Sequence, residues 1–160
     1  MNRRALFLSF VLLLFTAPLI AQLTTARLQQ VLDAWAALDP AKPGAFYAKD
    51  PGLVFYDVAP RAYKGWAEYE KGTRDVFKTM KSIAFKMHDA SVHNVGNTAW
   101  ASALVDTEVV DKDGKHDKID ARWTSIWEKR GNNWLIVHDH FSAPLPPPPP
   151  PPKPAAKKKP

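Results

Sequence analysis

The chain has 160 residues, no cysteine and a formal net charge of +6. The lack of cysteine excludes disulfides and thiol-linked lipid anchors. Six basic residues lie at the two ends: Arg3, Arg4, Lys153, Lys157, Lys158 and Lys159. The middle of the chain therefore holds 16 basic and 16 acidic residues and is formally neutral. The basic charge therefore gives no support for nucleic-acid binding by a folded domain.

Residues 1–21 have the layout of a secretory signal peptide. Arg3 and Arg4 precede the apolar run Ala5–Phe15, and small residues follow near Ala17 and Ala21. The run is short for a membrane span. We therefore expect an exported protein, periplasmic or secreted. A retained N-terminal anchor is the alternative, because Leu19 is large for the position three residues before the expected cleavage site.

Residues 145–160 form a proline- and lysine-rich tail that is expected to be disordered. Seven consecutive prolines, Pro146–Pro152, favour an extended polyproline II rod that spans roughly 20 Å. The lysines behind it form a small cationic cluster. Three interpretations are open: a solvated tail, a spacer that rests on an anionic envelope surface, or a ligand for a proline-binding domain.

Residues 22–144 are the usual length of a single domain. Apolar residues three and four positions apart predict a helix that starts at Thr24 or Thr25 and ends near Leu38. The Asp39-Pro40 pair ends it. Further along, the pattern predicts a short helix at Gly44–Ala48, a strand at Leu53–Val58 and a helix at Gly65–Met80.

Only strands are expected after the third helix. The predicted strands are Ile83–His93, Ala99–Val110, Lys118–Lys129 and Trp134–Phe141, with turns at Asp113-Gly114 and Arg130–Asn133. Helices first and an antiparallel meander afterwards indicate an α+β fold, with the helices on one face of a strongly curved antiparallel sheet. Such a cone leaves a hollow between helices and sheet.

Three segments carry a resemblance to a known family: Phe46-Tyr47-Ala48 ahead of Leu53–Asp57, Tyr63-Lys64-Gly65-Trp66, and Arg122–Pro144. In these the chain resembles the nuclear transport factor 2-like superfamily, specifically its SnoaL-like domains. Arg122–Pro144 is also similar to the association domain of calmodulin-dependent kinases. The resemblance implies an NTF2-like cone. It implies no single function, since the superfamily includes isomerases, cyclases, dehydratases and proteins without catalysis.

The register of the sheet decides which side chains meet. A two-residue turn at Asp113-Gly114 places Trp123 opposite Leu104, Ser125 opposite Ser102 and Trp127 opposite Trp100, all facing the hollow. The other face, with smaller and β-branched residues, is expected to pack against another subunit: Ala101, Ala103, Val105, Arg122, Thr124 and Ile126.

The turn before the last strand leaves two registers open. An odd loop, Gly131–Asn133, places Val137, Asp139 and Phe141 in the hollow, whereas an even loop places His138 and His140 there. The resemblance to association domains favours the odd loop. Those domains carry arginines at positions matching Ser125 and Phe141, so this chain lacks their means of holding a carboxylate.

Two aspartates are the candidate catalytic groups. Asp57 lies near the position of the steroid isomerases' base, and Asp139 is the second candidate. In an apolar hollow, a carboxylate gains a raised pKa and can take a proton from carbon next to a carbonyl. The matching oxyanion donors fall near Val31 and Ser125, where the family's tyrosine and acid are missing. Tyr56 or Tyr63 is the possible substitute.

Metal binding is a further option. His138 and His140 lie on one face of a strand, a spacing that can chelate a metal, and His88 or Asp139 is a possible third ligand. The alternative is hydrogen bonding within a dimer interface. A His-x-His pair without a clear third ligand is weak, so we expect no metal and no cofactor.

We therefore expect an exported protein with an aromatic-lined pocket for a small apolar or carbonyl-containing molecule, without catalysis. The alternatives are a lyase or isomerase with a pocket aspartate as base, and an assembly module that forms a homodimer through the sheet. The expected ligand-binding residues are Tyr56, Tyr63, Trp66, Trp100, Trp123, Ser125 and Trp127.

Overall fold

The computed structural model describes residues 21–58 and 60–145. Apart from Ala21 and Leu145, the expected signal peptide and the expected proline-rich tail lie outside the described residues. In the part of the chain that is described, every helix is too short or too polar to cross a membrane.

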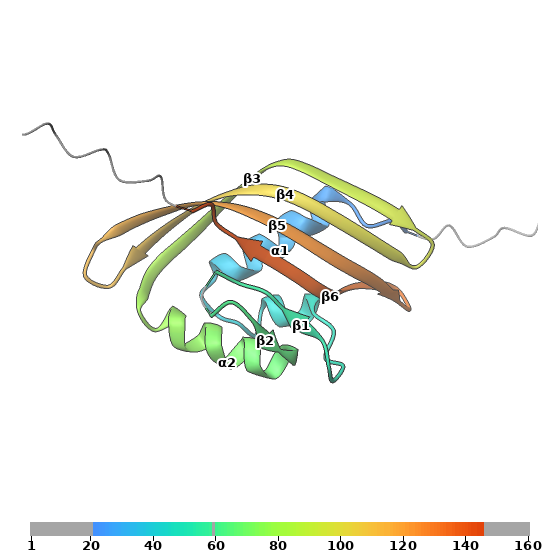
Figure 1. Cartoon of the computed structure of the whole chain (residues 1–160), viewed down its shortest axis with the longest axis horizontal. Coiled ribbons are helices and arrows are strands. Elements are labelled where there is room, and N and C mark those ends of the chain that lie inside the picture. The colour runs from blue at the N-terminus through green and yellow to red at the C-terminus, as the bar shows by residue number, and fades with distance from the viewer. Residues whose placement is uncertain (1–20, 59, 146–160) are drawn as a thin grey trace, which may run out of the picture.

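Two helices and a four-stranded antiparallel sheet make up the described structure (Figure 1). The sheet order is β3-β4-β5-β6, and β1 and β2 form a separate two-stranded sheet. This confirms the α+β architecture. The elements are α1 (Thr25–Ala36), the 3₁₀-helix η1 (Pro43–Phe46), β1 (Val54–Phe55), β2 (Tyr63–Lys64), α2 (Gly65–Phe77), β3 (Met80–Val95), β4 (Thr98–Asp111), β5 (His116–Arg130) and β6 (Asn133–Ser142).

Most element bounds differ from the expected ones by a few residues. The first helix ends at Ala36, because Leu38 adopts a left-handed φ of 55° that stops the helical path. The helix that was expected to reach Met80 ends at Phe77, since Met80 already pairs with Asp111 at the start of β3. The strand predicted at Leu53–Val58 is reduced to two residues.

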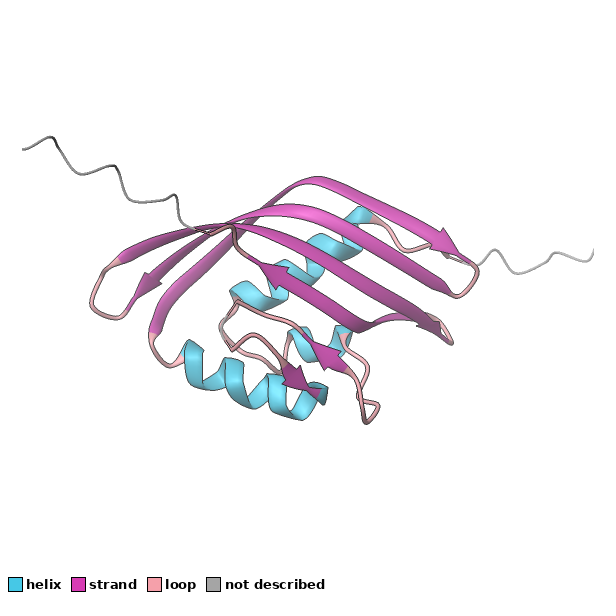
Figure 2. Ribbon diagram, viewed as in Figure 1, coloured by secondary structure: helices cyan, strands magenta, loops and turns pink. Residues whose placement is uncertain are grey.

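The sheet is strongly curved and arches over α1 (Figure 2). β3 carries a bulge between His88 and Ser91, where Asp89 has a φ of 51°. A second bulge lies in β6, opposite the Ile126–Trp127 step of β5. Bulges bend a strand and increase its twist. The curvature leaves a concave face toward the helices and a convex face toward solvent.

The predicted register between β4 and β5 was wrong by one residue. Ala103 lies opposite Trp123, Ala101 opposite Ser125 and Ala99 opposite Trp127. The concave face therefore sets three β4 alanines against Trp123, Ser125 and Trp127 of β5, and all six side chains are buried. Trp100, Leu104 and Ile126 point to the convex face, where each is more than one third exposed.

The loop causes this shift. Asp111 pairs with Lys115, and Gly114 adopts a φ of 84°, so three residues form the turn in place of the expected two. The side chain of Asp111 favours this loop, because its Oδ1 accepts hydrogen bonds from the backbone N–H groups of Asp113 (2.9 Å) and Lys115 (2.8 Å).

The last turn was also predicted with the wrong length. Arg130 pairs with Asn133, so Gly131 and Asn132 form a two-residue turn. The β6 bulge then places the extra residue Val137 between Ile136, which pairs with Trp127, and His138, which pairs with Ile126. Beyond the bulge, Asp139 and Phe141 return to the concave face as expected. Val137 does not, because it occupies the bulge.

The segment from Tyr47 to Tyr56 runs alongside β6 and brings the future site together. Tyr47 forms a parallel bridge with Ile136, and Tyr56 forms one with His140. The backbone N–H of Tyr56 donates to the carbonyl of Asp139 (2.9 Å), and its carbonyl accepts from Phe141 (3.0 Å). This pairing places Tyr47 and the residues after Phe55 next to the last strand.

Candidate functional site

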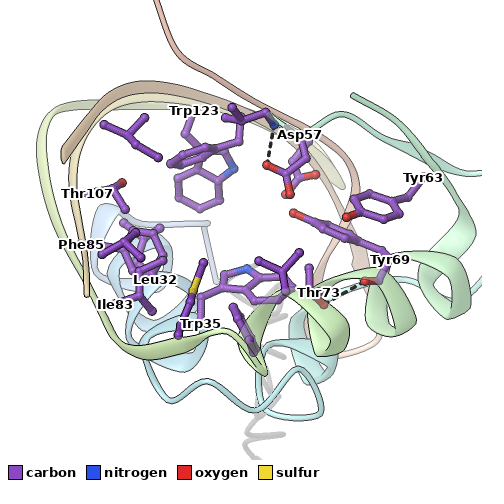
Figure 3. Close-up of a pocket in the computed structure, with 18 of the residues that line it drawn as sticks. Leu32, Trp35, Asp57, Tyr63, Tyr69, Thr73, Ile83, Phe85, Thr107 and Trp123 are labelled. Atoms are coloured by element: carbon purple, nitrogen blue, oxygen red, sulfur yellow. Dashed lines mark hydrogen bonds between the residues drawn. The ribbon is translucent and has the colours of Figure 1, made fainter. Parts of the chain in front are cut away.

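A cavity of about 260 Å³ lies between the concave face of the sheet and the two helices (Figure 3). Its walls are mostly aromatic and aliphatic. Val58 and Val76 line the cavity and are also exposed, so they belong to its rim. The other lining residues are Leu32, Trp35, Tyr47, Asp57, Tyr63, Tyr69, Thr73, Phe77, Met80, Ile83, Phe85, Thr107, Val109, Ile119, Trp123, Asp139 and Phe141.

Asp139 is the most buried carboxyl group of this site, with 2% of its surface exposed. The hydroxyl of Tyr47 donates to its Oδ2 (2.6 Å), and the indole N–H of Trp35 donates to the Tyr47 hydroxyl (3.2 Å). The chain of donors starts on α1 and ends on β6. It fixes the orientation of the carboxyl group, and the second oxygen, Oδ1, is buried without a hydrogen-bond partner among the described residues.

Burial raises the pKa of Asp139 to about 7, and the nearby charge of Asp57 raises it as well. The hydrogen bond from Tyr47 opposes this rise, because it favours the charged form. The indole N–H of Trp123 opposes it less, since it stands near the carboxyl group without making a hydrogen bond of normal geometry. Asp57 is half-buried, and burial also raises its pKa. Hydrogen bonds from the Val58 backbone and the Tyr69 side chain lower this pKa by a smaller amount. Burial in one apolar cavity therefore raises the pKa of both carboxyl groups.

Two tyrosines stand beside the carboxyl groups. The rings of Tyr63 and Tyr69 stack with their centroids 4.7 Å apart. Burial raises the pKa of Tyr63 to about 12 and that of Tyr69 well above its usual value, so both hydroxyls stay protonated. Gly72 makes room for this stack, because a Cβ there would overlap the Tyr63 ring. Figure 3 shows Asp57, Tyr63 and Tyr69 gathered at one end of the cavity.

The electrostatics of the cavity favour an uncharged occupant. Among the described residues that line it, none is an arginine, lysine or histidine, so an anion would find no countercharge there. Two carboxyl groups whose pKa values are raised by burial, and the tyrosine hydroxyls, are instead suited to hydrogen bonds with a neutral carbonyl or hydroxyl group.

Residues 25–146 match the SnoaL-like domain family, well over half of the chain. The chain belongs to this family. No protein of curated function matches the sequence of this chain.

Several solved structures share the fold of this chain. An NTF2-like superfamily protein from Salmonella enterica is 21% identical, with a TM-score of 0.69, over 84% of this chain and 94% of that one. A proposed dehydratase of the NTF2-like family from Streptomyces avermitilis is 14% identical, with a TM-score of 0.68, over 76% and 94%. The association domain of CaMKII from C. elegans is 18% identical, with a TM-score of 0.58, over 74% and 92%. At these identities the likeness shows the fold alone.

The structure brings four of the expected site residues of the SnoaL-like domain into the cavity: Asp57, Asp139, Tyr63 and Trp123. Both candidate catalytic aspartates therefore line the same cavity. They are close enough for the charge of Asp57 to raise the pKa of Asp139. The odd loop predicted before the last strand correctly placed Asp139 in the hollow. In the structure, however, the bulge in β6 turns Asp139 inward, and the loop has two residues.

Five expected ligand-binding residues lie elsewhere. Trp127 and Ser125 are core residues, because the indole N–H of Trp127 donates to the Ser125 hydroxyl (2.8 Å) and both are almost fully buried. Trp66 packs against Tyr47 outside the cavity. Trp100 is 47% exposed on the convex face, and its placement in the hollow was wrong because the register was wrong. Tyr56 is 43% exposed.

The histidine pair lies outside the cavity. His138 Nδ1 is 2.6 Å from the carbonyl oxygen of Val54, and His140 is exposed beside Tyr56. His88 contacts Asp106 on the convex face of β3 and β4. Among the described residues, no three histidine or acidic side chains converge in a geometry that could hold a metal.

Sequence reasoning missed Tyr47, Tyr69 and Thr107 as site residues. Tyr47 lies in the helix predicted at Gly44–Ala48 and Tyr69 in the helix predicted at Gly65–Met80, and neither was named as a site residue. Their polar ends reach the site because Tyr47 lies beside β6 and Tyr69 faces the sheet from α2. Thr107 shares a face of β4 with Val105 and Ala103, which the predicted register had placed away from the hollow, so only the observed register identifies it.

Proposed function

We propose that this SnoaL-like domain is an exported binding protein whose cavity holds a small, uncharged, largely apolar molecule with a carbonyl or hydroxyl group. The observation that carries this proposal is the joint presence in one cavity of aromatic walls and the Tyr47–Asp139 pair, in which Asp139 Oδ1 has no hydrogen-bond partner among the described residues. Apolar walls supply affinity, and a few placed polar groups orient the ligand.

Binding is tested by calorimetric titration of the full chain with 2-acetylnaphthalene, a flat ketone. Val58→Trp places a bulky side chain at the cavity rim and should weaken binding at least tenfold. Val95→Trp is the matched control, because Val95 is exposed at the far end of β3 and does not line the cavity. Equal binding by both variants would contradict the proposal. Mass spectrometry of molecules that copurify with the chain would identify the natural ligand.

A second candidate function is proton transfer of the lyase or isomerase kind, which the raised pKa of Asp139 beside Asp57 favours. In this scheme protonated Asp139 donates a hydrogen bond to the ligand carbonyl. The carboxylate of Asp57 takes a proton from the neighbouring carbon and returns one to it. The tyrosine hydroxyls of Tyr63 and Tyr69 offer further donors in place of the missing family residues.

This candidate is tested by following exchange of the acetyl methyl protons of 2-acetylnaphthalene for deuterium by NMR in D₂O. Catalysed exchange that is lost in Asp57→Asn, and kept in the exposed convex-face variant Asp120→Asn, would support it. Exchange at the buffer rate, together with ordinary pKa values of both aspartates in an NMR titration, would eliminate it.

A third candidate, assembly as a homodimer through the sheet, is favoured by the apolar residues on the convex face. Trp100, Leu104 and Ile126 are exposed there, and the ring of His93 stacks on Trp100 with centroids 5.1 Å apart. A two-fold axis would bury the same patch on both copies. Sedimentation at micromolar concentration should show a dimer that Ile126→Lys dissociates. A monomeric parent protein would refute it.

Export and surface attachment are proposed from the terminal sequences alone. Residues 1–21 would direct export, and the lysines of the tail would contact an anionic envelope surface. Cell fractionation should place the protein outside the cytoplasm. Cosedimentation with phosphatidylglycerol vesicles should fall when Lys157, Lys158 and Lys159 are replaced by alanine, and should stay unchanged when Lys118 is replaced.

A further inference from the structure

Three buried polar atoms of the cavity are left without a hydrogen bond. Within residues 21–58 and 60–145, no partner is found for Tyr63 Oη, Thr107 Oγ1 or Asp139 Oδ1, and all three residues line the cavity. The side chains are 3%, 3% and 2% exposed. A buried polar atom without a partner is costly, and in native proteins such atoms often mark a site for a bound molecule or water.

The three atoms do not form one cluster. Asp139 lies opposite Ser125 on β5, whereas Thr107 lies opposite Ile119, six residues back along the same strand. At about 3.4 Å per residue this is ~20 Å along β5, and the curvature of the sheet shortens the path across the hollow. Figure 3 shows Thr107 across the cavity from Asp57, Tyr63 and Tyr69, with Trp123 between them.

The neighbouring threonine shows why Thr107 is distinctive. Thr73 also lines the cavity, but its hydroxyl donates to the carbonyl oxygens of Tyr69 (2.8 Å) and Glu70 (3.2 Å) within α2. Its hydrogen bonding is satisfied by its own helix. Thr107 is on a strand whose backbone groups pair with β3 and β5, and no hydrogen-bond partner is found for its hydroxyl among the described residues, which leaves the hydroxyl available to an occupant of the cavity.

We propose that Thr107 forms a second polar subsite, and that the ligand is a flat, uncharged molecule with a polar group at each end and an apolar middle. One end, a carbonyl or hydroxyl, meets Asp139 and Tyr63. The apolar middle passes Trp123, and a hydroxyl or carbonyl at the far end meets Thr107. This deepens the proposed binding function and rests on it. Hydroxylated aromatic ketones have this chemistry.

The test compares ligands that differ only in the far hydroxyl. Calorimetry on the full chain uses 2-acetylnaphthalene and 6-hydroxy-2-acetylnaphthalene, and the longer pair 4-acetylbiphenyl and 4′-hydroxy-4-acetylbiphenyl. In at least one pair the hydroxyl should tighten binding about fivefold, the equivalent of one hydrogen bond. Thr107→Val keeps the shape of the side chain and should abolish this advantage while leaving the affinity of the parent ketone within about twofold.

Thr73→Val is the matched control, since it makes the same change in the same cavity at a hydroxyl that α2 already satisfies. It should change the affinities of both members of a pair by the same factor and keep the fivefold ratio. Circular dichroism confirms that each variant is folded.

The outcomes separate the two proposals. If the parent ketones bind and the hydroxyl adds nothing in either pair, or if Thr107→Val keeps the ratio, the second subsite is refuted and the binding cavity stands. If none of the four ligands binds the parent protein up to its solubility limit, the proposed binding function is refuted, and the inference with it.

Discussion

The Tyr47 hydroxyl donates a 2.6 Å hydrogen bond to Asp139 Oδ2 across a separation of 92 residues in sequence. This bond joins the segment after η1 to β6, the last strand of the sheet. The indole of Trp35, which donates to the same hydroxyl, adds the first helix, α1. The same bond orients the buried carboxyl group toward the cavity. Fold stability and the proposed ligand chemistry therefore share one contact, and both respond to the protonation of Asp139.

The stability of the domain should fall as the pH rises from about 4 to 7. The pKa of Asp139 is about 7 in the folded protein and near 3.8 when unfolded. In this window the folded state binds the additional proton, so raising the pH favours unfolding, by up to about 4 kcal/mol once the pH exceeds 7. Urea denaturation at pH 5 and pH 8 measures the difference.

Asp139→Asn should flatten this dependence and make the domain more stable than the parent at pH 8, because the amide stays neutral and still accepts from Tyr47. Asp57 shifts in the same direction, so a weaker slope should persist. Asp120→Asn, at an exposed position, is the control and should keep the parent's slope. A parent protein whose stability rises over this pH range would contradict the burial of Asp139.

Tyr47→Phe should raise the pKa of Asp139 above 7, because the lost hydrogen bond stabilised the charged carboxylate. Loss of the hydroxyl also leaves the Trp35 indole N–H without its acceptor, so the free energy of unfolding should drop by about 1–3 kcal/mol. NMR titration of the ¹³C-labelled carboxyl group measures the pKa. Tyr56→Phe, at an exposed tyrosine, should change neither quantity; an unchanged Asp139 pKa in Tyr47→Phe would refute the coupling.

Two tryptophans on the same pair of strands should respond oppositely to truncation. Trp127 is 0% exposed, and its replacement by alanine should cost about 3–5 kcal/mol. Trp100 is 47% exposed on the other face, and Trp100→Ala should cost less than about 1 kcal/mol in the monomer. Chemical denaturation at equal protein concentration compares them. Similar losses would mean that the register of β4 against β5 is not the one described here.

Gly72→Ala should destabilise the domain even though alanine is the better helix former. The propensity gain is about 1 kcal/mol, whereas a Cβ at this position overlaps the buried Tyr63 ring, and such overpacking costs about 1–3 kcal/mol. In a Tyr63→Ala background the overlap is gone, and the same substitution should be neutral or stabilising. Thermal unfolding of the parent, the two single variants and the double variant measures whether the effect of Gly72→Ala on stability changes sign. A destabilisation of equal size in both backgrounds would refute the contact between Gly72 and the Tyr63 ring.

The order of the elements and the family could be predicted because they depend on local patterns. Apolar spacing set the two helices, and alternation set the four long strands, each within a few residues of its observed bounds. The register could not, because it depends on single residues at the turns. The side chain of Asp111 favours a three-residue loop, whereas the Asp113-Gly114 pair had predicted a two-residue turn. The additional loop residue shifts β4 by one position against β5, so the β4 side chains that were expected in the hollow lie on the convex face.

The facing of Asp139 was predicted correctly from a loop that does not occur. The two-residue turn at Gly131 and Asn132 alone would have turned His138 and His140 inward, and the bulge at Val137 reverses this. The bulge lies beside the segment from Tyr47 to Tyr56, which pairs with β6. A bulge that depends on contacts with a distant segment leaves no clear signal in the strand's own sequence.

The sequence by itself determined that Leu23–Pro144 forms helices followed by a curved antiparallel sheet and that the folded part carries no net charge, and it named two aspartates as candidates for an apolar hollow. Only the tertiary structure decided which tryptophan faces the hollow, that Tyr47 holds Asp139, and that Thr107 lies across the cavity from them. The reason is physical: helix and strand periodicity are encoded within a few neighbouring residues, whereas turn length, bulges and the meeting of polar side chains depend on contacts between segments far apart in the chain.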